Sequence, residues 1–213
     1  MSVEVSSYLT VARPAEAEIE VKRSRFLCTV EPVGDEPAAR AVVERLRRQH
    51  WDARHHCSAF VLGPDGRVER SSDDGEPAGT AGAPMLDVLR GRGVTDVVAV
   101  VTRWFGGTLL GAGGLVRAYG DAGRAGLDAA GTLRRELRRE LVLEVGHADA
   151  GRVETELRHR GVVVVDTAYG TAVTLRVAVA PDREEALHAL VAELTGGTAA
   201  AAVAGERWVD ATP

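Results

Sequence analysis

VVAVVTRWFGGTLLGAGGLVRAY occupies residues 97–119 of the chain. The apolar run at 97–101 is typical of a strand that is buried inside a sheet. Five glycines follow within residues 106–114, a composition that suits neither a strand nor a helix interior. Apolar residues at helical spacing resume at Leu115. The stretch therefore predicts a central strand, a glycine-rich loop and a helix over residues 115–130.

A second glycine-rich loop precedes this one. Residues 72–82 read SDDGEPAGTAG, which combines three carboxylates with three glycines and a proline. A helix is predicted over residues 81–90, with Pro84 in its first turn, where the missing amide proton costs little. We therefore expect the backbone amides of residues 79–82 to form an anion site at the helix N-terminus. The alternative is an ordinary strand-to-helix loop.

The carboxylates of this loop have three candidate roles. Asp73, Asp74 and Glu76 offer oxygen ligands for a divalent cation, or an acid and a base, or acceptors for the amides of a turn. The turn role is favoured, because the nearby His55-His56-Cys57 run would alternate between the two faces of a strand and so supplies no compact set of ligands. The sequence predicts no metal, no cofactor and no catalytic residue.

Residues suited to binding lie on both loops. Cations beside aromatic rings, such as Arg103 with Phe105 and Arg117 with Tyr119, are found on RNA-binding surfaces and at the centres of protein interfaces. Alternatively, the two rings belong to the core and Arg103 pairs with the acidic loop. If the fold brings the loops together, the predicted binding residues are Asp73, Asp74, Glu76, Gly79, Thr80, Arg103, Trp104, Gly106, Gly107, Gly113, Gly114 and Arg117.

The two loops, at residues 72–82 and 100–120, resemble those of the IMPACT family in its bacterial, YigZ-type form. KRSRF at 22–26 and DARHHCSA at 52–59 add to the resemblance, and four segments in the right order are specific. Trp104 departs from the tyrosine that is usual in the family. The resemblance implies a two-layer N-terminal domain of ribosomal-protein type and a ferredoxin-like C-terminal domain, related to a pair in translation elongation factor G.

The resemblance also implies a link to translation control. Eukaryotic relatives restrain the activation of an initiation-factor kinase by competing for its co-activator, a role that uses an extra N-terminal domain without a counterpart in this sequence. We therefore expect a non-enzymatic protein that binds RNA, the ribosome or a translation-related protein. The alternative is a hydrolase or transferase that acts on a phosphate-bearing small molecule at the two glycine-rich loops.

Composition limits the partners. The net charge of −5 over 213 residues excludes a surface coated with polyanion-binding side chains, so any RNA contact must be local. Cys28 and Cys57 are too few for a disulfide framework. Neither a signal peptide nor a membrane-spanning run is apparent. We expect a cytoplasmic protein without membrane contact, and the oligomeric state stays open.

Two α+β domains are predicted, over residues 1–131 and 132–213. In the first, we expect a mixed sheet covered by helices on one face, after an irregular arm at residues 1–14. In the second, the pattern of strands and helices is βαββαβ, that of a ferredoxin-like fold. Asp182 is expected to cap the helix at residues 182–194.

Overall fold

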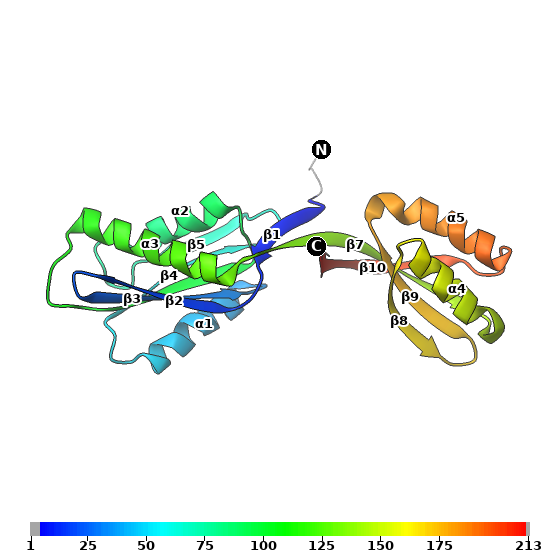
Figure 1. Ribbon diagram of the computed structural model, residues 1–213, viewed down its shortest axis with the longest axis horizontal. Helices are drawn as coiled ribbons and strands as arrows, with labels where there is room; N and C mark the ends of the chain where they lie inside the picture. Colours follow the sequence, from blue (N-terminus) through cyan, green and yellow to red (C-terminus); the bar gives the residue numbers. More distant parts are fainter. Residues whose placement is uncertain (1–4, 212–213) are drawn as a thin grey trace. The chain divides into compact units, whose positions relative to one another are not determined.

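The computed structural model describes residues 5–211 and divides into two compact units, Met1–Arg134 and Arg135–Pro213 (Figure 1). Each unit contains both helices and strands, so the α+β class with two domains is confirmed. The first unit contains β1 (Ser7–Val11), β2 (Ala15–Val21), β3 (Ser24–Pro32), α1 (Glu36–Gln49), β4 (His55–Leu62), β5 (Val68–Ser72), α2 (Gly82–Arg92), β6 (Val97–Trp104) and α3 (Ala112–Ala130).

Strand β6 lies at the centre of the first sheet and is buried on both faces. Val97, Ala99 and Val101 face the core that contains α2 and α3, whereas Val98 and Val100 face a second core with α1. Successive side chains of a strand point to opposite faces, so a continuous apolar run needs a cover on each face. Figure 1 shows α2 and α3 above this sheet and α1 below it. The expectation that helices cover a single face is therefore wrong.

The sheet of the first unit has the strand order β2-β3-β6-β4-β5. Every pairing in it is antiparallel, so the expectation of a mixed sheet is also wrong. The reason lies in the chain path. Strands β3 and β4 run in the same direction on either side of α1, but β6 inserts between them and pairs antiparallel with both.

Strand β1 falls within the expected irregular arm and corrects that expectation. Tyr8, Thr10 and Val11 are buried, and Leu9 accepts a hydrogen bond from the amide of Thr95. The contacts of β1 are with residues 94–96, far away in the sequence, so its local sequence gives little sign of this strand. Residues 1–4 of the expected arm lie outside the described residues.

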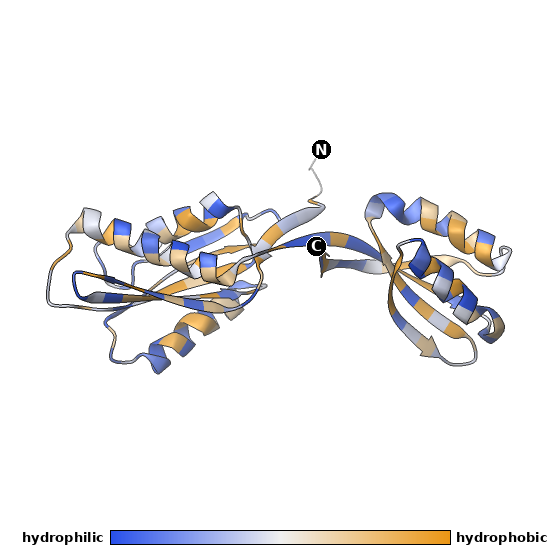
Figure 2. Cartoon of the chain, in the orientation of Figure 1, coloured by the Kyte–Doolittle hydropathy of each residue, from blue (hydrophilic) through white to orange (hydrophobic). Residues whose placement is uncertain are grey.

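The second unit contains β7 (Thr132–Val145), whose first residues precede the boundary, α4 (His147–His159), β8 (Val163–Tyr169), β9 (Val173–Val179), the short 3₁₀ helix η1 (Pro181–Arg183), α5 (Glu184–Thr195) and β10 (Ala201–Asp210). The antiparallel strand order β10-β7-β9-β8 is that of a ferredoxin-like fold. Hydrophobic and hydrophilic residues alternate along β9 (Figure 2), which places Val173, Leu175 and Val177 in the core under α4 and α5.

Helix α5 begins differently from the expectation. Pro181 starts the 3₁₀ turn, and α5 itself begins at Glu184, with Arg183 at the N-cap and no side-chain capping bond. Asp182 is thus inside the turn and is not the cap. Within residues 5–211, no helix combines the length and apolar character needed to cross a membrane.

Candidate functional site

Asp73 organises the acidic loop. Its carboxylate accepts hydrogen bonds from the amides of Gly79 at 2.7 Å, Ala81 at 3.0 Å and Gly82 at 2.8 Å, and the amide of Thr80 bonds to the carbonyl of Pro77. Partial burial acts to raise the pKa of Asp73, but these three amide bonds together lower it. The anion expected at the N-terminus of α2 is therefore a side chain of the protein itself, and it engages the amides that an external anion would need.

Asp74 fastens the same loop to two neighbouring elements. One carboxylate oxygen accepts from Arg47 of α1 at 2.6 Å and the other from the amide of His56 at 2.6 Å. Its carbonyl lies 2.8 Å from Nδ1 of His55. Asp74 adopts a left-handed conformation, with φ of 43°, which these contacts hold in place. The favoured interpretation of the two aspartates as loop-stabilising acceptors fits this geometry.

Glu76 joins the two glycine-rich loops. Its Oε1 accepts from Nη1 of Arg103 at 2.5 Å and from the hydroxyl of Tyr119 at 2.7 Å, and all three side chains are buried. Nε2 of His55 lies 4.0 Å from the same oxygen. The prediction that the loops meet is confirmed for Arg103. Tyr119 is fully buried, as the alternative interpretation required, but Phe105, which that interpretation also placed in the core, is largely exposed.

The titratable groups beside this ion pair, Cys57, Tyr119 and His56, are held in their neutral forms. Burial is the main reason that the pKa of the Cys57 thiol rises to about 12, although its hydrogen bond with Tyr119 acts in the opposite direction. Burial, then Cys57 and Glu76, raise the pKa of Tyr119. Desolvation lowers the pKa of His56, in spite of nearby Asp74, so its imidazole stays neutral. The thiol is therefore not an activated nucleophile, which requires a lowered pKa.

A cavity of about 420 Å³ opens above the Glu76–Arg103 pair. Its walls consist mainly of apolar residues from the second loop and from α3, with Arg54 just before β4 and His55 at the first position of β4. The lining residues are Arg54, His55, Glu76, Pro77, Arg103, Phe105, Leu109, Leu110, Gly111, Ala112 and Leu115. Leu109 is 84% exposed and Phe105 is 46% exposed, so the rim presents apolar groups to solvent.

The start of α3 also borders this cavity. Gly111 occupies the N-cap and provides no side-chain acceptor, so the first amides of this 19-residue helix lack the cap that Asp73 provides for α2. An uncapped N-terminus favours negative charge. The cavity thus combines apolar walls, two basic side chains and a helix N-terminus.

Comparison with known proteins relates the whole chain to one family. The Impact N-terminal domain matches residues 22–127, and a domain of unknown function (DUF1949) matches residues 143–198. The chain is 40% identical to the IMPACT family member YvyE of Bacillus subtilis (strain 168), over 90% of this chain and 88% of that protein. The chain belongs to the IMPACT family. It is also 39% identical to the IMPACT family member YigZ of Escherichia coli (strain K12), over 91% of this chain and 96% of that protein.

Two further relatives extend the comparison. A protein described as an IMPACT homolog from Saccharomyces cerevisiae (strain ATCC 204508 / S288c) is 34% identical over 46% of this chain and 39% of its own length. A crystal structure titled as that of a hypothetical protein is 38% identical, with a TM-score of 0.66, over 93% of this chain and 97% of that one. The IMPACT assignment thus covers both units.

Trp104 and Arg117, which the sequence groups with the site, lie elsewhere in this IMPACT-family chain. The indole of Trp104 donates to Asp52 at 3.0 Å and its ring lies 4.8 Å from the guanidinium of Arg25, away from the cavity lining. Arg117 is exposed and borders a separate depression between α2 and α3, where its Nε donates to the carbonyl of Gly113. Charge complementarity with the acidic loop therefore applies to Arg103 and not to Arg117.

The predicted glycines have different structural roles. A Cβ on Gly106 would lie 2.1 Å from the backbone of Arg23, so only glycine permits this approach between the second loop and β3. Gly107 has a φ of 82°. Gly113 and Gly114 lie in the first turn of α3, and Gly114 packs against Leu110 of the cavity. These glycines shape the loop that carries Phe105 and Leu109.

Arg54, His55 and Leu109 of the cavity lining were not among the predicted binding residues. Arg54 and His55 belong to the DARHHCSA segment, but only the antiparallel register, which sets His55 opposite Arg103, brings them to the cavity. Leu109 reaches it through the second loop. Among residues 5–211, no group of three or more His, Cys, Asp or Glu side chains is arranged to hold a metal ion.

Proposed function

We propose that the first unit is a non-enzymatic binding module for single-stranded RNA, through which the chain acts in translation as a cytoplasmic protein. The observation that carries the proposal is the cavity above the Glu76–Arg103 pair, with exposed Phe105 and Leu109 at its rim. An exposed aromatic ring beside an apolar recess is suited to stacking a single unpaired base.

The charges around the cavity support the same proposal. Arg54 and the amides at the start of α3 provide two groups of donors for a phosphate next to the stacked base. Arg103 does not serve this purpose, because Glu76 neutralises it at the floor. The overall charge of −5 restricts such binding to a few contacts, so affinity should be modest and dependent on salt.

The floor of the cavity supports binding over catalysis. Glu76 accepts from two donors through a single oxygen, and the pKa of Cys57 is raised to about 12. The bonds of Glu76 to Arg103 and Tyr119 hold these buried side chains together, although Nε of Arg103 has no hydrogen-bond partner among the described residues. This network holds Phe105 in place, since the guanidinium of Arg103 lies 5.8 Å from the centre of that ring.

A titration of fluorescein-labelled octauridylate with the full chain tests the proposal. We expect saturable binding that Phe105→Ala weakens by about tenfold, within the range measured for loss of a stacked base. The matched control is Trp51→Ala, which removes a ring that is 83% exposed and lies outside the cavity. Absence of binding at low salt, or equal losses in the two variants, would contradict the RNA proposal.

A second candidate is an enzyme acting on a phosphate-bearing small molecule. One observation favours it: His55 lines the cavity and lies 4.0 Å from the Glu76 carboxylate, the arrangement of a base and the group that orients it. The distinguishing measurement is release of inorganic phosphate from a panel of nucleotides and sugar phosphates. Turnover that His55→Gln abolishes would support the enzyme and exclude a purely binding role.

A further inference from the structure

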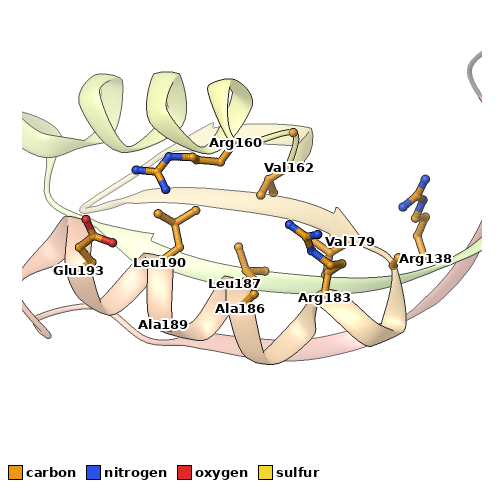
Figure 3. Close-up of a pocket in the computed structure, with 12 residues that line it drawn as sticks. Arg138, Arg160, Val162, Val179, Arg183, Ala186, Leu187, Ala189, Leu190 and Glu193 are labelled. Carbon is orange, nitrogen blue, oxygen red and sulfur yellow. The ribbon is translucent and has the colours of Figure 1, made fainter.

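The second unit contains a groove of about 580 Å³ between α5 and the C-terminal end of α4 (Figure 3). Its lining comes from β7, the α4–β8 connection, the end of β9, η1 and α5. The residues are Arg138, Arg160, Gly161, Val162, Val179, Ala180, Arg183, Ala186, Leu187, Ala189, Leu190 and Glu193. All of them lie within the second unit, and none belongs to the cavity described above.

The floor and the edges of the groove differ in polarity. Figure 3 shows Leu187 and Leu190 of α5 opposite Val162, with the arginines around them. The volume lies within the range of roughly 300–1,000 Å³ that is usual for small-molecule sites, which are likewise apolar with a few polar groups. Ala186 and Ala189 are exposed, so their small side chains leave the groove open.

The charge in the groove is unevenly placed. Arg138 and Arg183 mark one end, and Glu193 lies about 15 Å along α5 from Arg183 at a rise of about 1.5 Å per residue. Arg160 bonds to Glu156 at 3.0 Å and Arg138 to Glu136 at 2.6 Å. Within residues 5–211, the side chain of Arg183 makes no hydrogen bond or ion pair. The guanidinium of Arg183 is therefore unpaired at this end of the groove.

Arg138 lies at the same end of the groove as Arg183. Its Nε is buried and, among the described residues, has no hydrogen-bond partner. The unpaired guanidinium of Arg183 and the unsatisfied Nε of Arg138 lie in the lining of the same groove.

We propose that this groove binds a small amphipathic anion. An apolar body lies along Leu187 and Leu190, and a carboxylate or phosphate head is held by Arg183 and Arg138. Charge-assisted hydrogen bonds from guanidinium groups to such anions are stronger than neutral ones. The site and its ligand class are independent of RNA binding by the first unit.

Isothermal titration of the full chain tests the proposal with five probes, each below its micelle concentration: decanoate, decyl phosphate, decanol, decyltrimethylammonium and inorganic phosphate. We expect at least one of the two anionic amphiphiles to bind at least tenfold more tightly than the other three probes. The stronger of these two identifies the head group. Binding by inorganic phosphate alone, equal binding by all the amphiphiles, or no binding would overturn the proposal.

Matched variants locate the site. Arg183→Glu should weaken binding of the anion at least tenfold, whereas Arg158→Glu, an exposed position of α4 outside the groove, should leave it unchanged. Ala186→Trp should fill the groove and abolish binding, while Ala192→Trp, also exposed on α5 but outside the lining, should not. Equal effects within either pair would overturn the assignment to this groove.

Discussion

The cavity of the first unit and the groove of the second unit use arginine in opposite ways. In the first unit, Arg103 lies under the cavity, buried and paired with Glu76, and the rim is apolar. In the second unit, the floor of the groove is apolar and Arg183 stands exposed at its edge. A buried, paired charge fixes the positions of its neighbours, whereas an exposed, unpaired charge is available to a ligand. The presence of an arginine in or under a cavity therefore does not by itself show what that arginine does.

Replacing each of these two arginines by methionine tests this difference, with the largest expected effect on the free energy of unfolding. Arg103→Met leaves the Glu76 carboxylate buried without its cation, and we expect a loss of about 3–5 kcal/mol in the free energy of unfolding. Arg183→Met removes an exposed side chain and should change it by less than about 0.5 kcal/mol. Urea denaturation of each variant measures both. Similar losses in the two would contradict the distinction, and Glu76→Gln added to Arg103→Met should restore part of the first.

Two glycine-to-alanine substitutions, one in each unit, should change stability in opposite directions. Gly106→Ala would place a methyl group against the backbone of Arg23, and we expect it to cost at least about 1–3 kcal/mol. Gly151 lies within α4 and a Cβ there meets no atom within 4 Å, so Gly151→Ala should stabilise by about 0.5–1 kcal/mol. Thermal unfolding of the two variants distinguishes them by sign. A neutral Gly106→Ala would show that the loop is free to move from β3.

Much of this fold could be predicted from sequence, because the relevant signals are local. The run at 97–101 indicated a buried strand, and the second unit follows the βαββαβ order that its pattern predicted. Strand β1 was missed, since its burial depends on contacts with residues 94–96. The position of α1 was also missed, although the same run is apolar at both odd and even positions and so indicated two covered faces.

The candidate site was predictable only in part. Glycines and carboxylates marked both loops, and the pairing of Arg103 with Glu76 followed from their opposite charges. The use of Asp73 as the internal anion of α2 depends on the detailed path of the loop. Arg54 and Leu109 belong to the cavity through strand register and loop geometry, which spacing alone does not encode.

Replacing Asp73, which lies in the first unit, should have a smaller and pH-dependent effect on the free energy of unfolding. The pKa of its carboxyl is lower in the folded chain than in the unfolded chain, so it contributes stability above its unfolded pKa of about 4, and this contribution is lost as pH falls through the folded value. Asp73→Asn should cost about 1–2 kcal/mol at pH 7, as for loss of a helix cap. It should also flatten the decline in stability below pH 4. Urea titrations from pH 7 to pH 2 measure this, and a parallel decline in both proteins would contradict the role.

Alkylation of cysteine gives the smallest expected signal and reports on the first unit alone, because Cys28 and Cys57 both lie there. Both thiols are buried, and burial raises the pKa of each to about 12. We expect no modification by iodoacetamide at pH 8 in the native state and full modification of both in denaturing urea, measured by mass spectrometry. Rapid native labelling of Cys57 would reveal an activated thiol and favour the enzyme candidate.

The position of bound RNA tests the central claim most directly, that the cavity of the first unit is the binding site. Short RNA that contains 4-thiouridine is crosslinked to the full chain by ultraviolet light, and the modified peptides are identified by mass spectrometry. The account predicts crosslinks within residues 105–112, the segment with Phe105 and Leu109, and their loss in Phe105→Ala. Crosslinks confined to residues 135–211, or to the surface around Trp51, would contradict it.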